Sequence, residues 1–126
     1  MTHDLGESAF ADAGIPMAFV APGEERGGLG RIIVANAAMA FLTGRSQEEL
    51  EGLAFAQLIH HDDISLFEDQ IKRLREGEIE TCSFEKRFEH ANGHRVWGLA
   101  TVALANHRNG PMKDSLIVQV YDISER

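Results

Sequence analysis

Cysteine and long apolar runs are both scarce in this sequence. Cys82 is the sole cysteine, so no disulfide can form within the chain, and a lone thiol fits a reducing compartment. The longest apolar runs, such as residues 32–35, fall far short of the roughly 20 residues that span a bilayer. The N-terminus carries Asp4 and Glu7 in place of the basic start of a secretory signal. We therefore expect a cytoplasmic chain with no membrane contact.

Positive charge is scarce as well. Twelve Lys and Arg residues against 20 Asp and Glu residues give a net charge of −8 at pH 7. An acidic domain repels phosphate backbones, so we expect no nucleic-acid partner. The densest basic group, formed by Lys72, Arg73 and Arg75, has acidic residues around it, which is typical of a solvated helix face.

The motifs of common enzymes are also absent. The chain has no G-x-S-x-G nucleophile elbow, no G-x-x-x-x-G-K-[ST] phosphate loop and no H-E-x-x-H zinc motif. The glycines at positions 28 and 30 lack the third glycine of a dinucleotide fingerprint and precede a predicted strand. We predict that this chain is not an enzyme, and a metal-binding or enzymatic domain is kept only as a remote alternative.

The residues that are present fit one globular domain. A chain of 126 residues, 44% hydrophobic and 25% charged, can build a single core without disulfides. In the first half, glycine, proline and capping motifs divide the chain into short elements, and Asn36 is expected to cap the helix that follows it. We predict a helix over 4–13, strands over 17–21 and 31–36 around a loop at 23–30, and helices or turns over 37–42, 46–52, 55–59 and 65–76.

The helix predicted over residues 65–76 is the longest. It opens on Ser65 and Glu68, a second possible capping box after the one formed by Ser46 and Glu49. Four apolar residues recur in it at helical spacing and should face the core. They are Leu66, Phe67, Ile71 and Leu74.

The second half of the sequence predicts strands. Residues 81–90 alternate between apolar and polar, which predicts a strand. Asn92-Gly93 is a strong hairpin signal, and residues 95–105 form the second strand of that hairpin. A loop over 106–114 leads to a last strand over 115–123. This order predicts an α+β fold with an antiparallel sheet.

Both faces of the last two strands are apolar, whereas a sheet with one wet face would alternate. One face should pack on the helices. The other face should pack on the N-terminal helix or on a second copy of the chain, so we expect a homodimer. The predicted dimer face consists of Phe10, Trp97, Leu99, Ile117 and Tyr121.

Nearly the whole chain, about residues 15–126, resembles the PAS family of sensory domains. The matching fragments are Asn36-Ala-Ala, Leu42-Thr-Gly44, Ser46-x-x-Glu49-Leu-x-Gly52, Leu58-Ile-His-x-Asp-Asp63, Glu85-Lys-Arg87, Asn92-Gly93, Trp97 and Val120-Tyr-Asp-Ile-Ser-Glu-Arg126. His61 stands where the family usually has Pro, and Ser124 where it usually has Thr. The resemblance implies a five-stranded antiparallel sheet with short helices on one face, a possible cap helix in residues 1–14 and a sensory domain in residues 15–126.

The family resemblance also implies a function. In the family, the ending that corresponds to residues 122–124 joins the sensory domain to a helical linker and an output domain. The expected role is therefore sensing or signal relay in a two-component or cyclic-dinucleotide signalling protein, with a histidine kinase or diguanylate cyclase as output. Asp122 and Ser124 form the expected signal junction. Because the chain stops at Arg126, we expect it to be part of a longer protein. The alternative is a dimerisation scaffold without a ligand.

A ligand pocket is expected between the helices and the inner face of the sheet. Gly98 and Ala100 are small and could leave room for a small apolar ligand; the alternative is that aromatic side chains fill that room. The predicted pocket residues are Phe67, Ile71, Phe84, Phe88, Gly98, Ala100, Val102, Val118 and Val120.

The resemblance argues against two cofactors. Haem-binding members supply an axial His from the long helix, and residues 65–76 contain no His. Photoactive flavin members form an adduct with a Cys just after the position of Gly52, and residues 53–57 contain no Cys.

The cluster His60, His61, Asp62 and Asp63 carries side chains that can ligate a metal. Adjacent side chains point in different directions, however, and the aspartates precede a predicted helix. We expect Asp62 or Asp63 to cap that helix and expect no metal, with His60, His61 and Asp63 as the only candidates for one. Arg87 is expected to form a structural ion pair with these acids.

Overall fold

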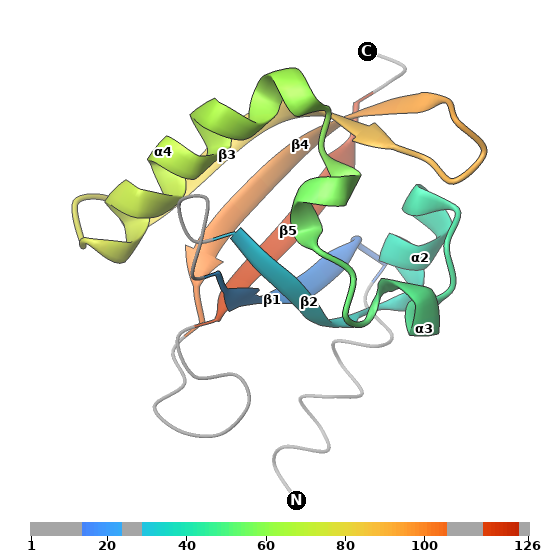
Figure 1. Cartoon of the computed structure of the whole chain (residues 1–126), viewed down its shortest axis with the longest axis horizontal. Coiled ribbons are helices and arrows are strands. Elements are labelled where there is room, and N and C mark those ends of the chain that lie inside the picture. Colours follow the sequence, from blue (N-terminus) through green and yellow to red (C-terminus); the bar gives the residue numbers. More distant parts are fainter. Residues whose placement is uncertain (1–13, 24–28, 106–114, 124–126) are drawn as a thin grey trace, which may run out of the picture.

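Five strands form a single antiparallel sheet in the order β2-β1-β5-β4-β3 (Figure 1). The computed structural model describes residues 14–23, 29–105 and 115–123. The strands are β1 (Met17–Pro22), β2 (Leu29–Ala35), β3 (Thr81–Glu89), β4 (Arg95–Leu104) and β5 (Leu116–Asp122). β5 lies between β1 and β4, so the last strand of the chain joins the N-terminal hairpin to the C-terminal one.

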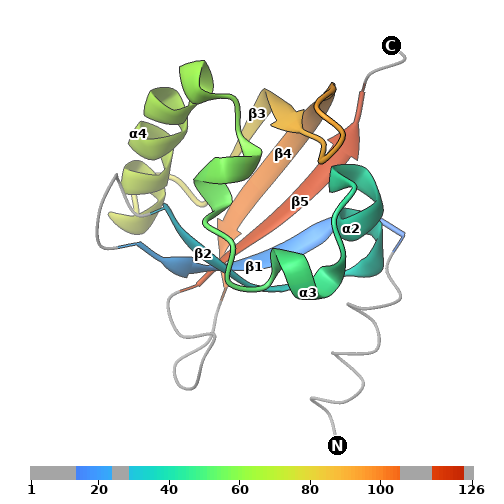
Figure 2. The same cartoon turned by 45° about the vertical axis from the view of Figure 1, so that its right-hand side comes forward.

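The helical layer comes from the segment between β2 and β3. It contains the helices α2 (Ala37–Thr43), α3 (Gln47–Leu50) and α4 (Ile64–Arg75), and the 3-10 turns η2 (Phe55–Leu58) and η3 (His61–Asp63). These elements lie over one face of the sheet (Figures 1 and 2). α4 contacts β3 and β4, whereas α2 contacts β1 and α3 contacts β2. The layer therefore covers both halves of that face.

Asn36 caps α2, as predicted. Its Oδ1 accepts hydrogen bonds from the backbone N–H groups of Met39 and Met17, each at 3.0 Å, and its Nδ2 donates to the carbonyl of Ile15 at 2.8 Å. The side chain is completely buried. One residue therefore satisfies the helix N-terminus and also fixes the start of β1 beside it.

The two predicted capping boxes have different outcomes. The box of Ser46 and Glu49 is present, with hydrogen bonds of 3.0 and 2.8 Å in the two directions. The second box is wrong. α4 begins at Ile64 with Asp63 at the N-cap position, which leaves Ser65 inside the first turn.

α4 buries one stripe of side chains. Phe67, Ile71 and Leu74 are at most 1% exposed, at the spacing i, i+4 and i+7 that places residues on one helix face. Leu66 was predicted to join them, and that prediction is wrong because its side chain is 55% exposed. Leu66 is rotated about 100° from Phe67 around the helix axis, so its side chain lies outside the buried stripe.

The predicted α+β class with a five-stranded antiparallel sheet and helices on one face is confirmed. The predicted loop over 23–30 extends too far, because β2 already begins at Leu29. The helix predicted over 4–13 lies outside the described residues. Within the described part of the chain, no helix has the length and apolar character needed to cross a bilayer.

Candidate functional site

The nine residues predicted to line a ligand pocket lie together between α4 and the inner face of the sheet. Phe67 and Ile71 come from α4, and the other seven from β3, β4 and β5. All nine are buried. The structure thus assembles the predicted set, while ligand binding by these residues stays a prediction.

The space beside Gly98 is occupied by neighbouring side chains. A Cβ atom at this glycine would lie 2.7 Å from Cγ1 of Val120 and 3.2 Å from Cε2 of Phe88. Further along the same interior, the rings of Phe67 and Phe84 stack with their centroids 4.8 Å apart. The small residue therefore serves close packing at this point and leaves no free volume beside it.

Lys86 is a buried cation on the inner face of β3, with 3% of its surface exposed. Its Nζ lies 4.9 Å from the ring centroid of Phe84. Burial lowers the pKa of Lys86, because the charged form is poorly solvated, and the negative charge of Asp63 opposes this effect. The aromatic ring and that carboxylate therefore both favour the charged form of the lysine.

Asp63 links the start of α4 to the edge strand β3. The helix cap was predicted at Asp62 or Asp63, and for Asp63 it is wrong. The Asp63 side chain makes no cap hydrogen bond and instead accepts hydrogen bonds from Nη2 and Nε of Arg87 at 2.9 and 3.4 Å. The predicted ion pair of Arg87 is thereby confirmed. Burial alone would raise the pKa of Asp63, but the hydrogen bonds from Arg87 and the positive charges of Lys86 and Arg87 lower it overall.

His60 is engaged within its own turn. The side chain is buried, and its Nδ1 accepts the backbone N–H of Asp62 at 3.2 Å. Across residues 14–23, 29–105 and 115–123, no group of three or more His, Cys, Asp or Glu side chains is arranged to hold a metal ion. The side chain of His61 lies outside the described part.

The outer face of the sheet carries two exposed aromatic residues from the predicted dimer face. Trp97 on β4 is 45% exposed and Tyr121 on β5 is 42% exposed, and Leu99 and Ile117 beside them are half-buried. The guanidinium carbon of Arg87 lies 5.6 Å from the Trp97 ring. Phe10 lies outside the described residues.

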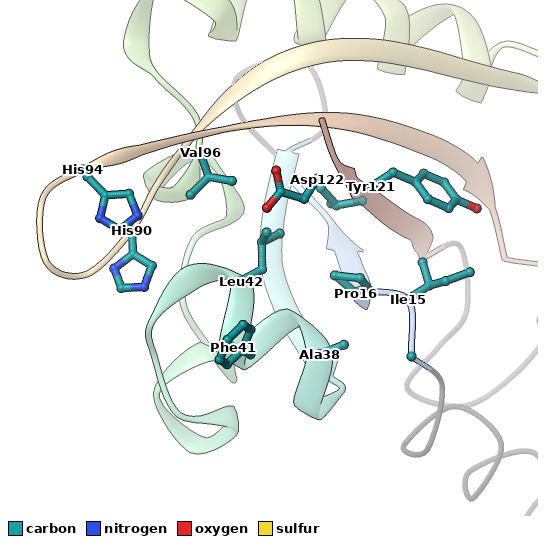
Figure 3. Close-up of a pocket in the computed structure, with 12 residues that line it drawn as sticks. Ile15, Pro16, Ala38, Phe41, Leu42, His90, His94, Val96, Tyr121 and Asp122 are labelled. Atoms are coloured by element: carbon teal, nitrogen blue, oxygen red, sulfur yellow. The ribbon is translucent and has the colours of Figure 1, made fainter. Parts of the chain in front are cut away.

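A groove lies beside the end of β5, between α2 and the β3–β4 hairpin (Figure 3). Its volume is about 660 Å³. The walls are mainly apolar, with two imidazoles at one end and a carboxylate directed into the groove from β5. The lining residues are Gly14, Ile15, Pro16, Ala38, Phe41, Leu42, His90, His94, Val96, Val120, Tyr121 and Asp122.

The hairpin loop at one end of this groove rests directly on α2. The backbone N–H of Ala91 donates to the carbonyl of Thr43 at 2.8 Å. The ring of His90 covers Gly44, which has a φ of 69° and would bring any Cβ atom against that ring. Contact and conformation therefore both require glycine at this position.

Comparison with known proteins decides the family. A family profile described as a PAS domain matches residues 26–125. This chain belongs to the PAS domain family. Over 97 residues, 76% of the chain, it is also 41% identical to the probable diguanylate cyclase DgcE of Escherichia coli, and the match spans 9% of that protein.

Solved PAS domains share the fold of the present one. The PAS domain of a protein from Colwellia psychrerythraea superimposes with a TM-score of 0.81 over 100% of both chains at 21% identity. A PAS domain from a two-component sensor histidine kinase gives a TM-score of 0.73 over 96% of both chains at 13% identity. The predicted family and fold are confirmed, and the chain is a sensory module of the kind found in signalling proteins.

The groove of this PAS domain was missed by the sequence reasoning. Val120, Tyr121 and Asp122 are the lining residues that were predicted to have a role, in the inner pocket, the dimer face and the signal junction respectively. The other lining residues come from short segments far apart in the chain, so no local motif marks them. The clearest sign of the site is that the large apolar side chain of Phe41 is exposed to solvent. The sequence alone does not reveal this exposure, because it depends on how the chain folds.

Cys82 is buried at the start of β3, and burial raises the pKa of its thiol, which disfavours the reactive thiolate. Ser124, the second residue of the expected signal junction, lies outside the described residues, so its role stays a prediction.

Proposed function

We propose that this PAS domain is a relay module that forms a homodimer through the outer face of its sheet. The observation that carries the proposal is the position of Trp97. Its exposed ring lies on the outer face, and its backbone carbonyl accepts the N–H of Ile123 at 3.0 Å. A partner chain that contacts Trp97 would therefore act on the residue that holds the end of β5.

The signal would leave through the segment that follows β5. Asp122 ends the strand and Ser124 follows, where the family resemblance puts the junction to an output domain. A shift in the pairing between β4 and β5 would change the direction in which the chain leaves the sheet. We propose the division into a cap at residues 1–14 and a sensory domain at 15–126 on the same resemblance.

The output domain proposed for the whole protein is a diguanylate cyclase or a histidine kinase. Support comes from the 41% identity to a probable diguanylate cyclase and from the likeness to a PAS domain of a sensor histidine kinase. Any catalytic activity would then belong to a domain outside this chain. We further propose a cytoplasmic location. We also propose that the chain has no nucleic-acid or membrane partner, because its net charge of −8 repels phosphate groups.

An apolar ligand inside the core is the alternative sensing mode. The packing of Phe88 and Val120 against Gly98 favours relay through protein contacts over a ligand stored at that point. In the relay proposal, the signal therefore enters through the dimer interface and not through a ligand in an internal pocket.

The test is the molar mass in solution, measured by light scattering across a range of protein concentrations. Wild-type protein is expected at twice the chain mass. Trp97→Glu and Tyr121→Glu should each weaken the dimer by about tenfold or more, because a two-fold axis places each new charge at the interface twice.

Leu66→Glu is the matched control, because Leu66 is 55% exposed on α4 in the helical layer and should not touch the dimer. A wild-type chain that stays monomeric at high concentration would contradict the proposal. So would a dimer that Leu66→Glu weakens as much as Trp97→Glu does.

A further inference from the structure

The groove between α2 and the β3–β4 hairpin has the dimensions of a small-molecule site. Its volume of about 660 Å³ falls within the roughly 300–1,000 Å³ that such sites occupy. Ala38, Leu42 and Val96 contribute apolar walls. Phe41 at its rim is 88% exposed, and large apolar side chains left open to water commonly mark binding surfaces.

Asp122 determines the charge that the groove prefers. Among the described residues that line the groove, it is the only Asp or Glu, and none of them is Lys or Arg. Its carboxylate is directed into the groove (Figure 3). The net charge of −8 adds a negative field around the whole chain. Both features favour a cation over an anion.

The other polar groups of the groove present aromatic faces. The imidazoles of His90 and His94 stack with centroids 4.4 Å apart and planes 15° apart. Together with Phe41 they offer surfaces on which a flat ring can stack, and the Phe41 ring also attracts a cation. We propose that the groove binds a small aromatic amine, with its ring among these side chains and its ammonium group near Asp122.

The groove touches both ends of the described domain. Ile15 and Pro16 precede β1, and Asp122 ends β5. The N–H of Val120 donates to the carbonyl of Pro16 at 2.9 Å, so the two ends are bonded beside the site. A bound amine would contact the start and the exit of the domain at once. Binding itself does not rest on the relay function proposed above, whereas transmission of the binding signal does.

The experiment is a titration of ¹⁵N-labelled protein with three probes of similar shape: benzylamine, benzyl alcohol and benzoate. The amide signals of Ala38, Leu42, Val96 and Asp122 are expected to shift with benzylamine. Its affinity should exceed that of benzyl alcohol by about threefold or more, as for a partly exposed ion pair, and benzoate should bind most weakly.

Two variants locate the site. Ala38→Phe should fill the groove and abolish the shifts, while Ala37→Phe on the exposed side of the same helix should preserve them. Asp122→Asn, which keeps the shape of the side chain, should reduce benzylamine affinity about threefold and leave benzyl alcohol unchanged. This second variant keeps the test decisive if Ala38→Phe fails to fold.

Shifts confined to residues away from the groove would overturn the proposal. Undiminished binding in Ala38→Phe would overturn it as well, and so would equal affinities for the three probes. Light scattering on the same samples reports the dimer separately, so a failure of amine binding and a failure of the relay proposal can be told apart.

Discussion

At the scale of single residues, Asp63 shows how tertiary contacts redirect a side chain. Local sequence favours a helix cap at this position, because an aspartate at a helix entry usually accepts backbone N–H groups. The folded chain brings the guanidinium of Arg87 within 2.9 Å, and a charge-assisted pair with two bonds is stronger than a cap bond. The carboxylate therefore connects α4 to β3.

Asp63→Asn should reduce the free energy of unfolding at pH 7 by no more than about 1 kcal/mol, because water screens the partly exposed pair. The pKa of Asp63 is lowered in the folded state, so the contribution of the pair is present above the ordinary aspartate pKa of about 4 and is lost as the pH falls through the lowered value. Urea unfolding at pH 7 and at successively lower pH should show the difference between variant and wild type shrink in acid.

Asp69→Asn is the control for that substitution, because Asp69 is exposed on α4. Its effect on stability should be small at each of these pH values. A stability difference for Asp63→Asn that grows in acid would show that the carboxylate is not held in its charged form by Arg87.

At the scale of elements, the contact between the β3–β4 hairpin and α2 forms one wall of the groove. Gly44 ends α2 in a left-handed conformation, and the ring of His90 from the hairpin lies over it. Gly52 has a similar φ of 86°, but no atom lies within 4 Å of a Cβ built there. An alanine at Gly52 would therefore test backbone strain alone, whereas an alanine at Gly44 would test backbone strain together with packing against His90.

Gly52→Ala should cost about 1–2 kcal/mol of stability, the strain of a left-handed residue with a Cβ atom. Gly44→Ala should cost about 1–3 kcal/mol more, because its methyl group also displaces the His90 ring. Thermal or urea unfolding measures both variants. Adding His90→Ala should recover part of the loss in Gly44→Ala only. Equal costs at the two glycines would mean that the His90 ring does not pack on Gly44.

At the scale of the whole molecule, the helical layer and the sheet enclose a core in which aromatic residues meet small ones. Phe88 and Val120 occupy the space over Gly98, and Phe67 and Phe84 stack next to Lys86. Interiors of this kind pack as densely as organic crystals, so one added methyl group lowers the stability of the fold.

Gly98→Ala should destabilise the domain by about 1–3 kcal/mol through overpacking against Val120. Val120→Ala should relieve that clash, so the double variant should be more stable than the sum of the two single effects predicts, by about 0.5–3 kcal/mol. A double-mutant cycle in urea measures the coupling. Strictly additive effects would indicate free space beside Gly98 and would favour an internal ligand.

The order of elements could be predicted from the sequence because its signals are local. The capping box of Ser46 and Glu49, the asparagine cap of α2 and the Asn92-Gly93 hairpin all act between neighbours in the chain. The alternation in β3 and β4 likewise placed Phe84 and Ala100 on the buried face. Prediction failed at Leu66 and Ser65, where a shift of one residue in the helix start and face changes which side chain is buried.

The sequence by itself determined the family, the order of elements along the chain, the caps at Asn36 and Ser46 and the apolar character of both faces of the last two strands, because each depends on local motifs or on a repeating pattern. Tertiary structure alone decided the partner of Asp63, the occupant of the space beside Gly98 and the existence of the groove. The groove requires the start of β1, α2, the hairpin and the end of β5 in one place, and only the folding of β5 between β1 and β4 brings them together.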